Sequence, residues 1–287
     1  MWTPIAEQIS QATGQPFRVR DRRPVGGGCI NQATALSDGD RTYFVKVNTP
    51  VQVEMFAAEA IALEQLYATQ TIRVPQPICW GCTDRHSFIA MEWLEFGRGD
   101  AAAWERMGEQ LAALHRWRGA EQFGWERNNT IGSTPQINTW TETWPDFFAI
   151  ERIGYQLRLA KRKGGQFPDT DRVIAVIRDR LADHQPQPSL LHGDLWSGNA
   201  ACTVAGEPVI IDPATYWGDR EADLAMTELF GGFPAAFYRG YNQAWPLDSG
   251  YPQRKALYNL YHVLNHFNLF GGGYGSQASR TLEQLLR

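Results

Sequence analysis

The stretch Leu190–Pro213, LLHGDLWSGNAACTVAGEPVIIDP, decides the fold of this chain. Its apolar start indicates a strand that ends in His192-Gly193-Asp194, and a turn follows as far as Asn199. A second apolar run, Pro208–Ile211, indicates another strand, which ends in Asp212. Two short strands therefore deliver the side chains of Asp194, Asn199 and Asp212 to one place.

These three side chains suit phosphoryl transfer. One carboxylate, Asp194, would accept the proton of the attacking hydroxyl, while the Asn199 amide and the Asp212 carboxylate would hold the Mg²⁺ ions that neutralise a triphosphate. The spacing H-x-D-x-x-x-x-N, followed by an apolar strand and Asp, is that of the catalytic loop and metal-binding aspartate of protein kinases. Gly193 replaces the usual Arg, and Asp212-Pro213 replaces Asp-Phe-Gly, which resembles the small-molecule kinases of the same fold, such as aminoglycoside and choline kinases. Each residue alone is more often a turn or a strand cap, so the prediction depends on their order.

Length and composition limit the class of protein. The chain has 287 residues, 43% of them hydrophobic, and 11 tryptophans, which is enough for a core without disulfides. A net charge of −4 argues against a broad nucleic-acid surface. The sequence contains no run of about twenty apolar residues that would span a membrane. The N-terminus lacks the regions of a signal peptide, so we expect a cytoplasmic protein with neither nucleic-acid nor membrane partners.

The four cysteines, Cys29, Cys79, Cys82 and Cys202, are too few for a disulfide scaffold. Cys79-x-x-Cys82 has the spacing of half a zinc site, but no second pair of cysteines or histidines accompanies it. We expect these two cysteines to lie in a strand with Trp80 and to be inert.

A glycine-rich turn, Gly26-Gly27-Gly28, lies between two predicted strands upstream. Such a turn lets backbone N–H groups approach phosphates without obstruction by side chains, as ATP binding requires. Hairpin flexibility alone would also account for three glycines. The position of the turn, just before a strand that carries a lysine, favours the phosphate-binding interpretation.

That lysine is Lys46, in the predicted strand Thr42–Val47, where apolar residues flank it. In kinases a lysine at this place holds the α- and β-phosphates of ATP and pairs with a glutamate of the next helix. The next helix is predicted over Glu54–Leu66, and Glu59 is its best candidate, ahead of Glu54 and Glu64. The alternative is a solvated lysine on an edge strand.

An adenine-binding segment is predicted where the strand Ser87–Trp93 runs into Leu94. Met91 would lie behind the base, and backbone groups near Glu92, Trp93 and Leu94 would contact its edge. We place a lobe boundary near residue 96, with an N-terminal ATP-binding lobe at 1–96 and a C-terminal catalytic and substrate lobe at 97–287. The predicted fold is α+β and two-lobed, protein-kinase-like, with an antiparallel sheet and a helix in the first lobe and a mostly helical second lobe.

Apolar periodicity predicts the remaining elements. Phe17–Arg20 alternates like a strand. Helices are predicted at Ala101–Trp117, Trp144–Lys161, Asp171–Leu181, Tyr238–Trp245 and Gln253–Phe270, with a last amphipathic turn or two at Thr281–Arg287. Asp223 is predicted to open a helix and to cap the backbone of the catalytic loop. Few residues separate Asp212 from this helix, so we expect no phosphorylatable activation loop.

The irregular segment between Phe123 and Trp144 is rich in Asn and Trp. Surface loops of this composition usually hold a ligand or dock on another part of the protein. Both possibilities remain open from the sequence.

The chain as a whole resembles the fructosamine kinase (ketosamine-3-kinase) family. The motifs that carry the resemblance are Gly26–Asn31, Phe44-Val45-Lys46, Asn129-Thr130-Ile131-Gly132 with Pro135-Gln136 and Asn138, HGDLWSGN at 192–199, Asp212-Pro213-Ala214, Met226–Phe233 and Asn265–Asn268. The resemblance implies ATP- and Mg²⁺-dependent phosphorylation of the 3-hydroxyl of a ketosamine, a sugar rearranged onto an amine. The adduct then decomposes and frees the amine, which is a deglycation repair. Ribulosamines, erythrulosamines and fructosamines, small or protein-bound, remain open as substrates, and Trp196 and His266 would contact the sugar.

The same resemblance concerns Cys29, because the family carries a phosphate-loop cysteine that can form an intermolecular disulfide. A thiol beside phosphate-binding N–H groups could have thiolate character. We therefore expect either a monomer or a redox-linked homodimer joined through Cys29. The alternative is a small residue that fills a tight turn.

Two other functions remain open. One is another small-molecule kinase of the same fold, of the choline or aminoglycoside type. The other is a nucleotide-binding module without catalysis, which loss of the base, the metal ligands or the lysine would indicate, although all are present.

Overall fold

The structure is a computed structural model that describes residues 1–26 and 31–287. The predictions for Gly27, Gly28 and Cys29 fall outside the described residues. The N-terminal part contains a five-stranded antiparallel sheet with the order β1-β2-β3-β5-β4. Its strands are β1 (Asp21–Val25), β2 (Gln32–Ser37), β3 (Thr42–Asn48), β4 (Pro77–Cys82) and β5 (Ser87–Glu92).

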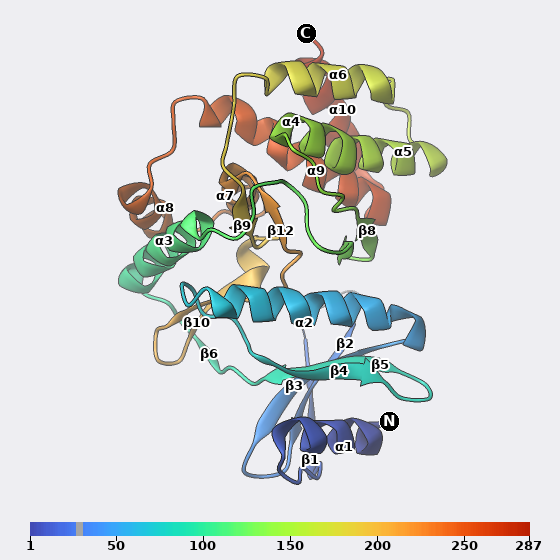
Figure 1. Cartoon of the computed structure of the whole chain (residues 1–287), viewed down its shortest axis with the longest axis vertical. Helices are drawn as coiled ribbons and strands as arrows, with labels where there is room; N and C mark the ends of the chain where they lie inside the picture. The colour runs from blue at the N-terminus through green and yellow to red at the C-terminus, as the bar shows by residue number, and fades with distance from the viewer. Residues whose placement is uncertain (27–30) are drawn as a thin grey trace.

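Two helices cover the two faces of this sheet. Helix α1 (Trp2–Thr13) lies on one face, and α2 (Val53–Ala68), which follows the short helix η1 (Pro50–Gln52), lies between the other face and the rest of the chain (Figure 1). Alternation along β3 explains the placement: Val45 and Val47 pack in a cluster with residues of α1. Lys46 therefore points to the opposite face, toward α2.

The remainder of the chain is mostly helical. Its strands are short: β6 (Phe96–Gly97), β7 (Asn129–Ile131), β8 (Thr134–Gln136), β9 (Ser189–Leu191), β10 (Ala200–Thr203), β11 (Pro208–Ile210) and β12 (Tyr216–Gly218). Its helices are α3 (Ala101–Arg116), α4 (Trp144–Phe147), the π-helix η2 (Phe148–Gly154), α5 (Tyr155–Arg162), α6 (Thr170–Arg180), the 3₁₀ turn η3 (Ser197–Asn199), α7 (Arg220–Leu229), α8 (Ala235–Ala244), α9 (Tyr251–Phe270) and α10 (Gly273–Leu285).

The large hydrophobic core extends from α2 into the helical part. Phe56 of α2 and Met91 of β5 belong to the same buried cluster as Leu111 and Leu190. The lobe boundary near residue 96 stays a prediction, because this core runs across it. No helix in the described part of the chain is long and apolar enough to cross a membrane.

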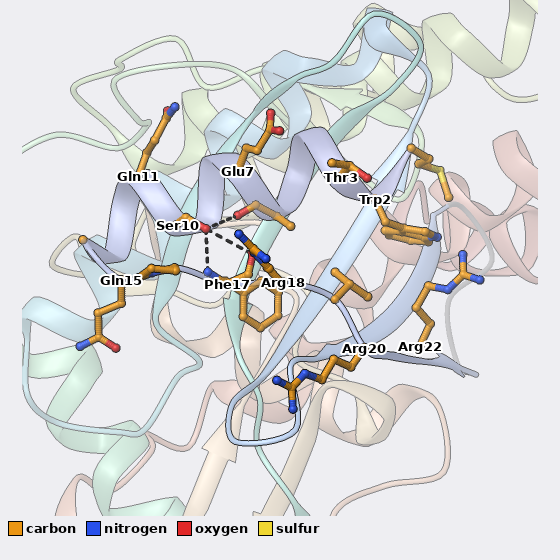
Figure 2. Close-up of a pocket in the computed structure, with 15 residues that line it drawn as sticks. Trp2, Thr3, Glu7, Ser10, Gln11, Gln15, Phe17, Arg18, Arg20 and Arg22 are labelled. Carbon is orange, nitrogen blue, oxygen red and sulfur yellow. Dashed lines mark hydrogen bonds between the residues drawn. The ribbon is translucent and has the colours of Figure 1, made fainter.

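The strand predicted at Phe17–Arg20 is wrong, since β1 begins only at Asp21. The backbone of Phe17 bonds to a helix side chain instead of a neighbouring strand: its N–H donates to Ser10 Oγ at 2.8 Å, and Ser10 Oγ donates to its carbonyl at 3.3 Å (Figure 2). The buried Phe17 ring anchors the segment under α1. A groove of about 1090 Å³ runs between α1 and this segment, and Arg18 and Arg20 are among its lining residues (Figure 2).

Helix α8 begins at Ala235 and α9 at Tyr251, before the predicted Tyr238 and Gln253, and two further helix starts differ from prediction. The C-terminal helix α10 begins at Gly273, well before the predicted Thr281, because Gly271 and Gly272 make the turn with φ of 67° and 62° and the helix begins at once. The prediction placed the start too late because three successive glycines usually indicate a loop and not the beginning of a helix. Asp223 does not open α7, since the helix begins at Arg220 with Asp219 as its N-cap.

Candidate active site

Lys46 lies at the centre of two ion pairs. Its Nζ is 2.6 Å from Glu59 Oε1 on α2 and 2.6 Å from Asp212 Oδ1. Burial by itself would lower the pKa of Lys46, but the carboxylates of Asp212 and Glu59 raise it above its ordinary value. Burial raises the pKa of Glu59, and the Lys46 charge opposes that rise. The predicted Lys46–Glu59 pair is present, and the structure adds Asp212 to it.

Asp223 holds the backbone of the catalytic loop. The N–H groups of His192 and Gly193 donate to its two carboxylate oxygens at 2.7 and 2.8 Å, as the cap predicted from the sequence requires. Burial would raise the pKa of Asp223, but hydrogen bonding and the charge of His115 lower it below the ordinary range. The carboxylate thus stays ionised as an acceptor.

His192 links the two strands of the site. Its Nε2 donates to the Ile211 carbonyl at 2.8 Å, and its own carbonyl accepts from Ala214 N at 2.8 Å. Burial lowers the pKa of His192, which favours the neutral ring. The catalytic loop and the segment after Asp212 are therefore fixed to each other.

Gly193 is required by the backbone at its position. Its φ is 84°, and a Cβ there would lie 2.0 Å from the Ala214 carbonyl oxygen. A residue with a side chain would clash with that carbonyl and strain the backbone. The replacement of the usual Arg by Gly follows from this close approach.

Asp194 and Asn199 are in contact. Asn199 Nδ2 donates to the Asp194 carbonyl at 2.9 Å and to its carboxylate Oδ2 at 3.3 Å. Burial raises the pKa of Asp194 to about 7, with further contributions from the negative charges of Asp212 and Asp223. The carboxylate is therefore a stronger base than an ordinary aspartate.

The donor set fits a magnesium ion. Carboxylate and amide oxygens are the ligands that Mg²⁺ takes in proteins. The Nδ2 of Asn199 is engaged by Asp194, which leaves its oxygen as the ligand atom. The Asp212 side chain is 44% exposed and so accessible to an ion. A cation here would also neutralise the carboxylate charges that raise the pKa of Asp194.

In the predicted adenine-binding segment, one residue is buried and another already uses its backbone N–H in a hydrogen bond. Met91 is buried, and the N–H of Glu92 donates to the Gln76 carbonyl at 2.8 Å, so that group is not available to a base. The Glu92 carboxylate pairs with Arg73 at 2.5 Å. Leu94 is half-buried, and Arg23 lies over the Trp93 ring at 5.2 Å. Gly26, which begins the glycine turn, is exposed.

The two predicted sugar contacts lie in different surroundings. Trp196 is 37% exposed and follows Asp194 by two residues. His266 lies in an aromatic cluster, with ring centroids 4.7 Å from Phe230 and 5.1 Å from Tyr274. Ser197 Oγ donates to the Phe230 carbonyl at 3.1 Å, which joins the catalytic loop to this aromatic cluster.

Sequence reasoning singled out the Asn-rich segment but missed the contacts through which its polar residues support the site. The Asn-rich segment does dock on another part of the protein, because Asn129 and Gln136 donate to the carbonyls of Thr215 and Ala214. Asn129 bonds to Asn138, and Asn138 in turn bonds to Arg152, which is fully buried. No signal indicated it, since an arginine on an amphipathic helix normally faces solvent.

The cysteines show no special chemistry in the described residues. Cys79 and Cys82 lie on β4 with Trp80, as predicted, and burial raises the pKa of Cys79 to about 11. The potential metal ligands that cluster in the described chain are His184, Asp219 and Glu221. Arg254 and Tyr258 already bond to these carboxylates.

Comparisons with known proteins agree with this geometry. The model of the fructosamine kinase family matches residues 1–287. A protein named probable ketoamine kinase from Synechocystis sp. is 62% identical over 286 residues, which cover 100% of this chain and 97% of the relative. A solved protein from Haemophilus somnus, assigned by name to the fructosamine-3-kinases, has a TM-score of 0.94 at 33% identity and covers 100% and 98% of the two chains.

A more distant likeness concerns the fold alone. An aminoglycoside phosphotransferase solved with ADP and hygromycin B has a TM-score of 0.63 at 17% identity, with 99% and 98% of the two chains covered. The fold is therefore protein-kinase-like, as the sequence predicted. The full-length match of the family model and the identity to the Synechocystis relative lead to one conclusion: this chain belongs to the fructosamine kinase family.

Proposed function

We propose that this protein is a kinase that uses ATP and Mg²⁺ to phosphorylate the 3-hydroxyl of ketosamines in deglycation repair. The observation that carries the proposal is the arrangement of Asp194 beside Asn199, with Asp212 held by Lys46, in a chain of the fructosamine kinase family. The names of the relatives support a ketoamine substrate.

Each residue of the site would have its own role in phosphoryl transfer. Asp194 would accept the proton of the substrate hydroxyl, and burial, which raises its pKa, makes it a stronger base than an ordinary aspartate. Asn199 and Asp212 would hold Mg²⁺, which supplies neutralisation of the phosphate charge when bound. Lys46, fixed by Glu59, would contact the α- and β-phosphates.

The nucleotide would bind between the two predicted lobes, residues 1–96 and 97–287. Gly26, with the two glycines after it, would lie against the phosphates. Met91 would back the adenine, and backbone groups of Trp93 and Leu94 would contact its edge, since the N–H of Glu92 is engaged by Gln76.

The substrate pocket would be bounded by Trp196, beside the base, and by the aromatic cluster of His266. Both present neutral rings: burial lowers the pKa of His266, which favours the uncharged imidazole. Aromatic rings of this kind stack on the apolar faces of sugars. Ribulosamines, erythrulosamines and fructosamines all carry the required 3-hydroxyl.

We also propose a cytoplasmic protein that acts without nucleic-acid or membrane partners, as a monomer or as a homodimer joined by Cys29. Non-reducing electrophoresis of the oxidised wild type and of Cys29→Ser tests the dimer. An oxidant-induced dimer that persists in the variant would contradict the role of Cys29.

Turnover tests the activity directly. ATP consumption with Mg²⁺ would be measured against ribuloselysine, erythruloselysine, fructoselysine, free ribulose, choline and kanamycin. We expect turnover only of the amine-linked ketoses, with the product phosphorylated at the 3-hydroxyl by NMR. Turnover of choline, kanamycin or free ribulose in their place would overturn the substrate class, and ATP binding without any turnover would favour a non-catalytic module.

A further inference from the structure

The backbone of Asp212 is strained. In the described chain, Gln70 and Asp212 are the non-glycine residues with positive φ, and the value for Asp212 is 56°. This left-handed conformation is unfavourable for residues with a Cβ, although Asp adopts it more readily than most. It persists only where the surrounding structure holds it, and such strain gathers at functional sites. The contacts that hold Asp212 are therefore of interest for its role.

The two residues after Pro213 are held by side-chain amides of the β7–β8 hairpin. Gln136 Nε2 donates to the Ala214 carbonyl at 2.9 Å, and Asn129 Nδ2 donates to the Thr215 carbonyl at 2.8 Å. Both amides are buried. From the other side, Ala214 N donates to the His192 carbonyl. The segment is thus fixed from two directions directly after the strained residue.

A buried arginine sets the direction of these amides. The guanidinium of Arg152 can only donate, and its Nη2 donates to Asn138 Oδ1 at 2.7 Å. The other end of that amide, Asn138 Nδ2, must then donate, and it bonds to Asn129 Oδ1 at 2.9 Å. With its oxygen used as an acceptor, Asn129 turns its NH₂ group to Thr215.

Arg152 has no carboxylate partner in the described part of the chain. Its side chain is fully buried, and its Cζ lies 4.5 Å from the ring centroid of Phe147 and 4.0 Å from that of Tyr216. It occupies the π-helix η2, a helix type that is frequent at functional sites. The two Nη atoms of Arg152 bond to neutral acceptors, and its Nε is buried without a hydrogen-bond partner among the described residues. Burying a charge in this way is costly, which indicates a task beyond packing.

We infer that Gln136 and Asn129 are positioning residues for the metal aspartate. They hold the backbone of Ala214 and Thr215 so that Asp212 keeps its left-handed conformation and its carboxylate stays where Lys46 contacts it. Arg152 gives the amides their fixed direction. The inference rests on the proposed function only through the assignment of Asp212 and Asn199 as Mg²⁺ ligands, and the sugar does not enter it.

Direct metal binding tests this inference. Mn²⁺ would replace Mg²⁺, and EPR would measure its binding to the full-length protein in the presence of a non-hydrolysable ATP analogue. The variant Gln136→Met keeps the length of the side chain and removes its hydrogen bonds. We expect its dissociation constant for Mn²⁺ to rise at least tenfold, because partners that orient metal ligands commonly contribute 10- to 100-fold to affinity.

Gln156→Met is the matched control. Gln156 is also a fully buried amide of the helical part, but it bonds to Asn265 and Asn268, not to the segment after Asp212. We expect it to lose thermal stability to a similar extent and to bind Mn²⁺ within twofold of wild type. If Gln136→Met does not fold, Asn129→Ala removes the bond to Thr215 and is measured in its place.

Two results would overturn the inference. One is that Gln136→Met and Gln156→Met lose the same amount of melting temperature and bind Mn²⁺ with the same affinity. That result would show that the Gln136 amide supports the fold and does not position Asp212. The other is a wild type that binds no Mn²⁺ with the analogue, which would also remove the proposed metal ligands. Wild-type Mn²⁺ binding with no turnover of ketosamines would instead overturn the proposed substrate alone.

Discussion

Replacement of Asp194 by asparagine should stabilise the metal-free protein while it abolishes turnover. In the folded protein burial raises the pKa of Asp194 from 3.8 to about 7, with smaller contributions from two nearby carboxylates. The unfolded chain ionises near the lower value, so between pH 4 and 7 the folded state binds more protons. The ionised carboxylate therefore destabilises the fold, and the free energy of unfolding falls as the pH rises through this range.

The size of the effect follows from the shift. About three pKa units, at about 1.36 kcal/mol each, give about 4 kcal/mol above pH 7, an upper bound because the side chain is partly exposed. A chain of 287 residues has an unfolding entropy of about 0.6 kcal/mol/K. Asp194→Asn should thus raise the melting temperature at pH 8 by up to about 7 °C, and the gain should shrink toward zero near pH 4.

Calorimetry of the metal-free wild type and variant at pH 8, 6 and 4.5 would measure this gain. Asp179→Asn, which changes an exposed aspartate of α6, is the control and should not shift the melting temperature. Turnover should fall at least about 100-fold in Asp194→Asn, the size typical of a lost general base. Equal melting of variant and wild type at pH 8, or a gain that does not depend on pH, would refute the reasoning.

Three further changes test the contacts around the site. Lys46→Met should lower kcat/KM at least about 100-fold and, since it leaves Glu59 buried without a partner, destabilise the fold by about 3–5 kcal/mol in urea titrations; unchanged kinetics would contradict the role of the lysine. Asp223→Ala should cost about 2–5 kcal/mol because two buried N–H groups of the catalytic loop lose their acceptor, and a wild-type melting curve would speak against the cap. Trp125→Phe removes the 2.8 Å hydrogen bond to Gln65 on α2 and should cost about 1 kcal/mol by urea unfolding, whereas no loss would show that this bond contributes nothing.

The arrangement of the candidate catalytic residues could be predicted because local geometry dictates it. His192, Asp194 and Asn199 lie within one short loop, so their spacing leaves few arrangements in space. Lys46 alternates with buried valines on β3, and this period of two puts it on the face of the sheet toward α2. Glu59 then follows from the helical positions that face this lysine.

The supporting contacts could not be predicted, because they join segments far apart in the sequence. Gln136 and Ala214 are 78 positions apart, and the sequence of the Asn-rich segment does not indicate which carbonyl groups its amides bond to. Arg152 resembles a surface residue in a sequence pattern, since burial of its charge depends on rings and amides from three other segments. Nor could the bonding of Ser10 to Phe17 be predicted, and it prevented the predicted strand.

The segment between Asp212 and α7 is short and held in place, which supports the expectation that no activation switch is needed. Only residues 213–219 separate Asp212 from the helix that begins at Arg220, and most of them form hydrogen bonds or strand pairs. Tyr216–Gly218 forms β12 and pairs with β9, and Trp217 exchanges two backbone hydrogen bonds with Gly124. The hairpin amides of Asn129 and Gln136 also bond to this segment. No stretch of it is therefore long enough and free enough to move away from the site. The position of Asp212 is therefore set by the fold itself, and we expect the catalytic arrangement to require no covalent modification of this segment.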